Sequence, residues 1–120
     1  ERFEMISAIM ADAFISLGVD ARVGEVPGEY CPGKWSVNVA GKVKVMGVGQ
    51  RLVRRAAHIG GVVVVDGGER IRDVLIPVYR SLSLDWDPRT AGALADRLDR
   101  RTRERRARGP GGLGLRGRAG

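Results

Sequence analysis

Three runs of β-branched residues between positions 36 and 65 constrain the fold of this chain more than any other feature. The runs are Ser36–Val39, Lys42–Leu52 and Ala57–Val65. β-branched side chains fit the pleated surface of a sheet. The first two runs are separated by Ala40-Gly41, which is a plausible two-residue hairpin turn. We therefore predict strands that pair in an antiparallel sheet.

Amphipathic helices are predicted on both sides of these runs. Apolar residues recur at spacings of three and four over residues 2–17 and over Glu69–Leu82, where Pro77 is expected to bend or loosen the helix. Val19–Val26 alternates loosely, as a strand does, and Thr90 can cap a last helix that reaches about Arg106. The order of elements indicates an α+β domain, mainly an antiparallel sheet with packed helices.

Length and composition exclude several classes of protein. A chain of 120 residues with 43% hydrophobic and 29% charged residues is typical of one small globular domain, not of a disordered or collagen-like chain. The longest aliphatic run, Ile59–Val65, is far shorter than the roughly 20 residues of a membrane helix, so no membrane partner is expected. One cysteine and one histidine are too few for a metal site. The lone cysteine favours a reducing compartment, and we predict a cytoplasmic location.

The net charge of +7 is concentrated in the last quarter of the chain. Residues 1–88 carry 11 basic and 11 acidic side chains, whereas residues 89–120 carry 10 arginines and 3 acids. The Arg-rich segment has no aromatic residue to stack on bases and ends in a Gly-rich stretch. We predict a solvated helix followed by a disordered tail, with a nucleic-acid contact as the less favoured alternative.

The second run of the hairpin combines a lysine with glycines in a way that indicates a ligand. Strict alternation places Lys44 on the same face as Met46 and Val48, and Gly47 with Gly49 on the other face. An ammonium beside apolar neighbours needs an anion or a carbonyl as its partner. Glycines weaken a strand unless something approaches the backbone closely. The alternative is an exposed lysine on an edge strand with glycines at a bulge.

The single cysteine, Cys31, lies in a Gly/Pro-rich loop, which is a better place for a reactive group than a core strand. Lys34 or Lys44 nearby would favour its thiolate, and His58 would act as a base if the fold brings it close. The alternatives are a small buried cysteine and a packed strand histidine.

Three stretches resemble the lipoate–protein ligase family, which is related to octanoyltransferases and biotin–protein ligases. They are Gly28-Glu29-Tyr30-Cys31-Pro32-Gly33, Ser36-Val37-Asn38-Val39 and Gly41–Arg51. The most specific part is the Lys-x-x-Gly-x-x-Gln-Arg pattern from Lys44 to Arg51. The similarity runs from about Glu1 to about Pro88. It implies a fold like that of class II synthetases and biotin–lipoate ligases. The family's Arg-Arg and Gly-rich strand is absent from the chain, so we expect an incomplete, C-terminal part of the catalytic domain.

The resemblance also implies a site. In the family the lysine at the place of Lys44 contacts the acyl carbonyl, and in some members a cysteine at the place of Cys31 carries the acyl group as a thioester. The expected catalytic residues are therefore Lys44 and Cys31, and the expected substrate-binding residues are Met46, Gly47, Gly49 and Gln50. Adenylating members open the first hairpin strand with Asn-Asp, where this chain has Trp35-Ser36. This departure favours a transferase over an ATP- and magnesium-dependent ligase.

The function implied is transfer of a lipoyl or octanoyl group to a lysine of a lipoyl carrier domain or of a glycine cleavage H-type protein. Residues 1–88 would form the partial catalytic domain, and residues 89–120 the Arg-rich helix and tail. Two alternatives remain open. One is a non-catalytic binding module of the same fold, and the other is a nucleic-acid binder that uses the Arg-rich tail.

Overall fold

A computed structural model describes residues 1–98, 104, 108 and 109, and these contain two α-helices, four strands and two short 3-10 helices. In chain order the elements are α1 Arg2–Ser16, β1 Ala21–Val23, β2 Val37–Val39, β3 Val43–Val53, β4 Ala56–Val63, α2 Gly68–Ser81, η1 Pro88–Thr90 and η2 Leu94–Arg97.

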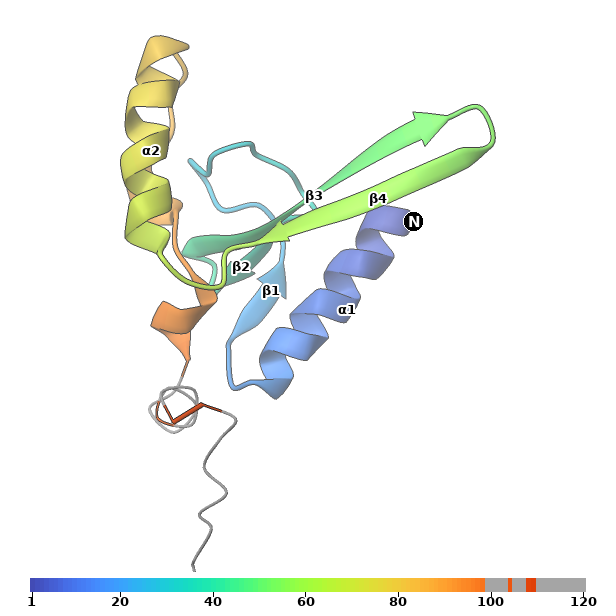
Figure 1. Cartoon of the computed structure of the whole chain (residues 1–120), viewed down its shortest axis with the longest axis horizontal. Coiled ribbons are helices and arrows are strands. Elements are labelled where there is room, and N and C mark those ends of the chain that lie inside the picture. The colour runs from blue at the N-terminus through green and yellow to red at the C-terminus, as the bar shows by residue number, and fades with distance from the viewer. Residues whose placement is uncertain (99–103, 105–107, 110–120) are drawn as a thin grey trace, which may run out of the picture.

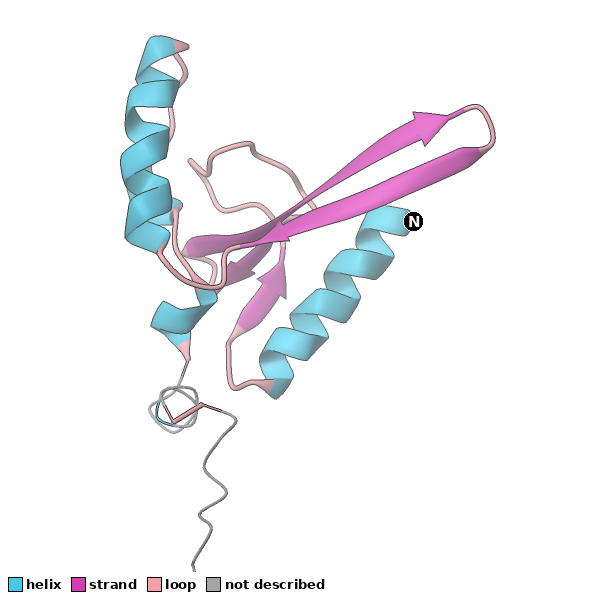
Figure 2. Ribbon diagram, in the orientation of Figure 1, coloured by secondary structure: helices cyan, strands magenta, loops and turns pink. Residues whose placement is uncertain are grey.

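The four strands form one sheet in the order β1-β2-β3-β4, and each neighbouring pair is antiparallel (Figure 2). Helix α1 lies along β1. Helix α2 lies on the opposite side of the sheet from α1 (Figure 1). The prediction of an α+β domain with a mainly antiparallel sheet is confirmed. The strand predicted over Val19–Val26 is shorter, and α2 runs without interruption through Pro77.

The turn between β2 and β3 forms where the sequence predicts it. Ala40 and Gly41 both have positive φ, at 56° and 70°, as a type I′ turn requires. The Lys42 amide donates to the Val39 carbonyl at 3.0 Å, and Asn38 Oδ1 accepts from the Gly41 amide at 2.8 Å. The turn therefore fixes how β3 starts against β2.

A bulge in β3 changes which side chains share a face. Asn38 pairs with Lys44 but Val37 pairs with Met46, so Val45 is an extra residue on β3. Strict alternation, which put Lys44 with Met46, is therefore wrong beyond this point. A Cβ built on Gly47 would lie 3.5 Å from Lys44 Cε, which shows that Lys44 and Gly47 face the same side.

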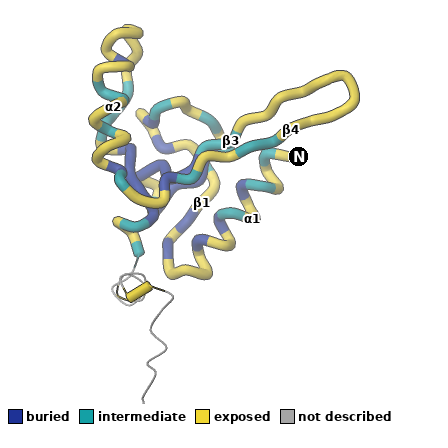
Figure 3. The backbone as a smooth tube through the Cα atoms, in the orientation of Figure 1, coloured by how far each residue is buried: buried dark blue, intermediate teal, exposed yellow. Residues whose placement is uncertain are grey.

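The core lies between α1 and the inner half of the sheet. It includes Phe14 of α1, Val37 of β2, and Val43, Val45 and Met46 of β3, all at most 5% exposed. The outer half of the β3–β4 hairpin projects beyond this core and is exposed (Figures 1 and 3). The hairpin is thus anchored at its base and open to solvent at its tip.

The segment after α2 differs from the predicted long helix. It forms η1 and η2 instead of a helix from Thr90, and Ala91, Ala93 and Leu94 are buried. Ala91 pairs with Lys44 of β3 in a parallel bridge, and the Leu94 amide donates to the Val64 carbonyl at 2.9 Å. The packed unit therefore continues past residue 88. The Gly-rich tail and most of the predicted last helix lie outside the described residues.

Within the described part, no helix is both long and apolar enough to cross a bilayer.

Candidate functional site

A cavity of about 760 Å³ opens between the β3–β4 hairpin, the start of α1 and the segment that joins β1 to β2, which we call the Cys31 loop (residues 24–36). Its lining includes five of the six site residues expected from the sequence: Cys31, Lys44, Gly47, Gly49 and Gln50. The volume falls within the about 300–1,000 Å³ typical of small-molecule sites. The sixth residue, Met46, lies in the core at 2% exposure, because the bulge turns it away from the Lys44 face.

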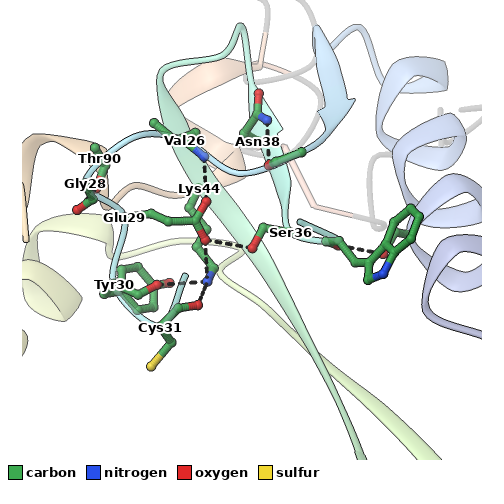
Figure 4. Close-up of polar contacts among 12 residues, drawn as sticks. Val26, Gly28, Glu29, Tyr30, Cys31, Ser36, Asn38, Lys44 and Thr90 are labelled. Atoms are coloured by element: carbon green, nitrogen blue, oxygen red, sulfur yellow. Dashed lines mark hydrogen bonds and ion pairs between the residues drawn. The ribbon is translucent and has the colours of Figure 1, made fainter. Parts of the chain in front are cut away.

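Lys44 is almost fully buried, at 2% exposure, and the chain itself occupies all three of its ammonium donors. Nζ lies 2.8 Å from Glu29 Oε2, and it donates to the carbonyl oxygens of Tyr30 at 2.9 Å and Cys31 at 2.7 Å (Figure 4). The Tyr30 ring lies 4.8 Å from Nζ as a cation–π partner. The partners that the sequence analysis expected from a ligand are thus supplied by the Cys31 loop.

Glu29 is the buried counter-ion of Lys44. Its side chain is fully buried, and Oε2 also accepts from Ser36 Oγ at 2.7 Å, while Oε1 accepts from the Val26 amide at 2.6 Å. A buried ion pair is tolerated when further hydrogen bonds satisfy its remaining groups, and these contacts do so. The pair ties the middle of the Cys31 loop to β3.

Cys31 is held by its backbone on two sides while its side chain stays exposed. Its amide donates to Tyr79 Oη at 2.7 Å, and its carbonyl accepts from Lys44. Its φ of +43° lies in the left-handed region, which is sparsely populated by residues other than glycine. The carbonyl points toward the Lys44 ammonium and the sulfur points away from it (Figure 4).

The two ends of the Cys31 loop are tied to other elements. The Gly28 carbonyl accepts from the Asp87 amide at 2.7 Å, next to η1, and Gly28 needs its φ of +85° to pass Asp87. At the other end the buried Ser7 of α1 donates to the Trp35 carbonyl at 2.7 Å. The loop therefore rests on α1, α2, β3 and η1 together.

The two tyrosines beside the Cys31 loop pack against Trp86 and have raised phenol pKa values. The Trp86 ring lies 5.3 Å from the Tyr79 ring and 6.0 Å from the Tyr30 ring. Burial raises the pKa of Tyr30, and the nearby Cys31 and Glu29 side chains raise it further. Burial also raises the pKa of Tyr79, with a contribution from its hydrogen bond to the Cys31 side chain. Both phenols thus stay neutral to higher pH than usual.

The glycines of β3 leave space at the cavity wall. A Cβ on Gly49 would meet nothing within 4 Å, and one on Gly47 would reach only the Lys44 side chain. Because both residues line the cavity, their small size keeps that volume open.

Lys34 and His58 are the two further residues that the sequence suggested as acting on the Cys31 thiol. Lys34 and His58 also line the cavity. Lys34 lies over the Trp35 ring, with Nζ 5.2 Å from its centroid. In the described part of the chain, no hydrogen bond joins His58 to Cys31, so the structure does not assemble the predicted base with the thiol.

Sequence reasoning missed Glu29 and Tyr79. The need of a buried Lys44 for an anion was a signal for Glu29, which lies two residues before Cys31. Tyr79 lies 48 residues from Cys31 in the chain, and no local pattern connects them. The assembled site presents an exposed thiol, a buried ammonium and an open cavity side by side. Such a set can hold an acyl chain and bring its carbonyl to a nucleophile.

Comparison with known proteins finds similarity to three curated acyltransferases. The chain is 35% identical over 80 residues to the octanoyl-[GcvH]:protein N-octanoyltransferase of Geobacillus kaustophilus, covering 67% of the chain and 28% of that protein. It is 28% identical over 108 residues to the enzyme of the same name from Exiguobacterium sibiricum, covering 82% of the chain and 39% of that protein. It is 24% identical over 104 residues to the lipoyl-[GcvH]:protein N-lipoyltransferase of Listeria monocytogenes, covering 78% and 37%.

The chain thus spans between 28% and 39% of the length of these curated relatives. No protein-family model matches it. The relatives confirm the resemblance to the lipoate–protein ligase family. Over the part that it spans, the chain therefore belongs to the lipoate–protein ligase family, together with these octanoyl- and lipoyltransferases.

Proposed function

We propose that this chain carries part of the active site of an acyltransferase that moves an octanoyl or lipoyl group between protein lysines. The relatives' names specify an octanoyl or lipoyl group on GcvH as the donor and a protein nitrogen as the acceptor. The observation that carries the proposal is the meeting of the Cys31 peptide and the Lys44 ammonium at the wall of one cavity.

The proposed reaction proceeds in two steps. The Cys31 thiolate attacks the carbonyl carbon of the donor amide, an S–C bond forms, the C–N bond breaks, and the donor lysine leaves as an amine after taking a proton. The amine of the acceptor lysine then attacks the thioester, a C–N bond forms, and the thiol is released as the S–C bond breaks. Covalent catalysis of this kind divides one difficult transfer into two easier ones and needs no ATP.

Lys44 would stabilise the negative charge that develops on the acyl oxygen. Because Glu29 and two loop carbonyls occupy its donors, an acyl oxygen reaches Nζ by replacing the carbonyl of Tyr30 or Cys31. Such an exchange keeps three partners on Nζ, and its cost is the hydrogen bond that the displaced loop carbonyl loses. Glu29 would keep the ammonium in place during the exchange.

Gly47, Gly49 and Gln50 would border the acyl chain. Gly47 and Gly49 leave room along β3, and Gln50 lines the same cavity one step farther toward the hairpin tip. Met46 is left out of this assignment, because it supports the core beneath β3.

We further propose a fold of the biotin–lipoate ligase type for the complete catalytic domain, with a lipoyl carrier domain or an H-type protein as the acceptor. The lone thiol fits a cytoplasmic location, where it stays reduced. An ATP- and magnesium-dependent ligase is the less favoured variant, since Trp35-Ser36 replaces the usual Asn-Asp. We assign no role in binding nucleic acid to the described residues.

The test is transfer of an octanoyl group from an octanoylated H-type protein to a lipoyl carrier domain, followed by mass spectrometry. In the full-length protein that contains this chain, we expect transfer by the wild type without ATP, and its loss in Cys31→Ala and in Lys44→Ala. Ser16→Ala is the control, because its exposed hydroxyl bonds only within α1. Undiminished transfer by both site variants would refute the assignment, and a strict need for ATP would favour the ligase.

A non-catalytic binding module is the second candidate, and the full occupation of the Lys44 donors favours it. It predicts that the wild type binds the octanoylated donor with no transfer, and that Cys31→Ala binds it equally well.

A further inference from the structure

Tyr79 is a residue of α2 whose hydroxyl touches Cys31 at two atoms. The Cys31 amide donates to Tyr79 Oη at 2.7 Å, and Oη lies 3.5 Å from Cys31 Sγ. Because the oxygen already accepts from the amide, its own proton is directed to the sulfur. Sulfur is a weak acceptor as a thiol and a stronger one as a thiolate.

The phenol is held rigidly in this position. Tyr79 is 9% exposed, and its ring packs on Trp86. Cys31 has the positive φ of +43°, a conformation that persists only where surrounding contacts fix it. The Tyr79 hydroxyl holds the backbone amide of Cys31, and the Lys44 ammonium holds its backbone carbonyl.

We infer that Tyr79 is a positioning residue that orients Cys31 and stabilises its thiolate by donating a hydrogen bond to the sulfur. The inference rests on the proposed function, in which Cys31 is the nucleophile. A hydrogen bond donated to the charged form of an acid stabilises that form, and the thiolate is the reactive form of a cysteine.

Other ionisable groups belong to the Cys31 loop, lie beneath it or line the same cavity, and Tyr79→Phe leaves them unchanged. Lys44 of β3 with its counter-ion Glu29 lies beneath the loop. Tyr30 and Lys34 line the cavity from the Cys31 loop. Arg51 and His58 line it from the β3–β4 hairpin. A comparison of Tyr79→Phe with the wild type therefore isolates the hydroxyl.

The first experiment measures the rate at which iodoacetamide alkylates Cys31 as a function of pH. In Tyr79→Phe we expect alkylation about three- to tenfold slower near neutral pH, with the two rates converging where both thiols are fully ionised. Ser81→Ala, which removes another hydroxyl from α2 that bonds only to Pro77, should follow the wild type. Identical rates for Tyr79→Phe at every pH, or a ratio that does not change with pH, would overturn the inference.

A second measurement leaves Tyr79 intact. Cys31→Ala removes the sulfur, so in a Tyr30→Phe background, where Tyr79 is the only tyrosine left, the absorbance titration should show the phenol ionising at lower pH than with the cysteine present. An unchanged titration would contradict the contact. Neither measurement depends on acyl transfer: a wild type that never becomes acylated refutes the proposed function, whereas unaltered alkylation in Tyr79→Phe refutes this inference alone.

Discussion

At the scale of single residues, the Lys44 ammonium organises the site. It joins a fully buried carboxylate of Glu29 to two backbone carbonyls of the Cys31 loop. A buried charge is stable only with such partners, so the loop and the lysine depend on each other. The same residue is thus a structural support of the loop and the proposed catalytic cation.

This dependence predicts an energetic coupling between Lys44 and Glu29. Lys44→Met leaves the Glu29 carboxylate buried without its counter-ion, and we expect a loss of about 3–5 kcal/mol in the free energy of unfolding. The double variant Lys44→Met/Glu29→Gln should recover much of that loss, because the amide oxygen still accepts from the Val26 amide and the amide NH2 can donate to the Ser36 hydroxyl. Urea unfolding of the two single variants and the double variant measures the coupling. Strictly additive losses would contradict it.

Tyr30 predicts how stability depends on pH. Its pKa is raised in the folded chain, chiefly by burial, so the folded state holds the phenolic proton more tightly than the unfolded state. This contribution to stability is fully present below about pH 10, the usual phenol pKa, and is lost as the pH rises through the raised value. Urea midpoints above pH ~10 should therefore fall more steeply for the wild type than for Tyr30→Phe. Equal slopes would be evidence against the buried phenol.

At the scale of elements, the sequence predicted most of the regular structure. The boundaries of α1, β3, β4 and α2 lie within one or two residues of the predicted ones, because their periodicities are long and strong. The Ala40-Gly41 turn followed from its residue types. The bulge at Val45 did not, since a bulge is set by pairing with another strand and leaves no local pattern. It moved Met46 into the core and put Gly47 beside Lys44.

The segment after α2 was mispredicted for a similar reason. Thr90 looks like a helix cap, but the residues after it are held by tertiary contacts. Arg72 of α2 donates to the carbonyls of Pro88 at 3.0 Å and Ala91 at 3.1 Å, and Gly92 packs directly on Val43. These contacts outweigh the local helical preference.

Gly92 gives a test of this packing. A Cβ there would overlap the Val43 side chain, so Gly92→Ala should lower the free energy of unfolding by about 1–3 kcal/mol through overpacking. Gly49→Ala is the matched control, because a Cβ on that glycine meets nothing within 4 Å. Thermal unfolding followed by circular dichroism compares the two. A Gly92→Ala variant as stable as Gly49→Ala would show that the segment does not pack against β3 as described.

At the scale of the whole molecule, the basic excess and the buried core do not change at the same residue. The basic excess begins after residue 88, whereas buried residues continue to Leu94 and the partly buried Leu98 still packs against the core. The charge balance therefore suggested a boundary that the packing crosses. Charge patterning reports on solubility and partners, not on where a core ends.

Two truncations test this difference. Removal of residues 99–120 should leave the thermal midpoint and any transfer activity close to those of the whole chain. Removal of residues 89–120 also deletes Ala91, Ala93 and Leu94 from the interior, and should lower the midpoint strongly. If the two truncated chains unfold at the same temperature, residues 89–98 do not contribute to the core.

The site was predictable in its parts and not in its assembly. Lys44 and Cys31 were singled out by their places on a strand and in a loop, and a resemblance to a known family gave their expected roles. The structure joins them through a 2.7 Å hydrogen bond. Glu29 and Tyr79 act on them from other segments, and that proximity is a property of the fold.

The most direct test of the acyl-transfer account is the intact mass of the full-length protein that contains this chain after incubation with an octanoylated H-type protein. We predict a mass increase of one octanoyl group in the wild type. The adduct should be removed by hydroxylamine, as a thioester is, and should be absent from Cys31→Ala. A wild type that gains no mass, or an adduct that persists in Cys31→Ala, would contradict the account.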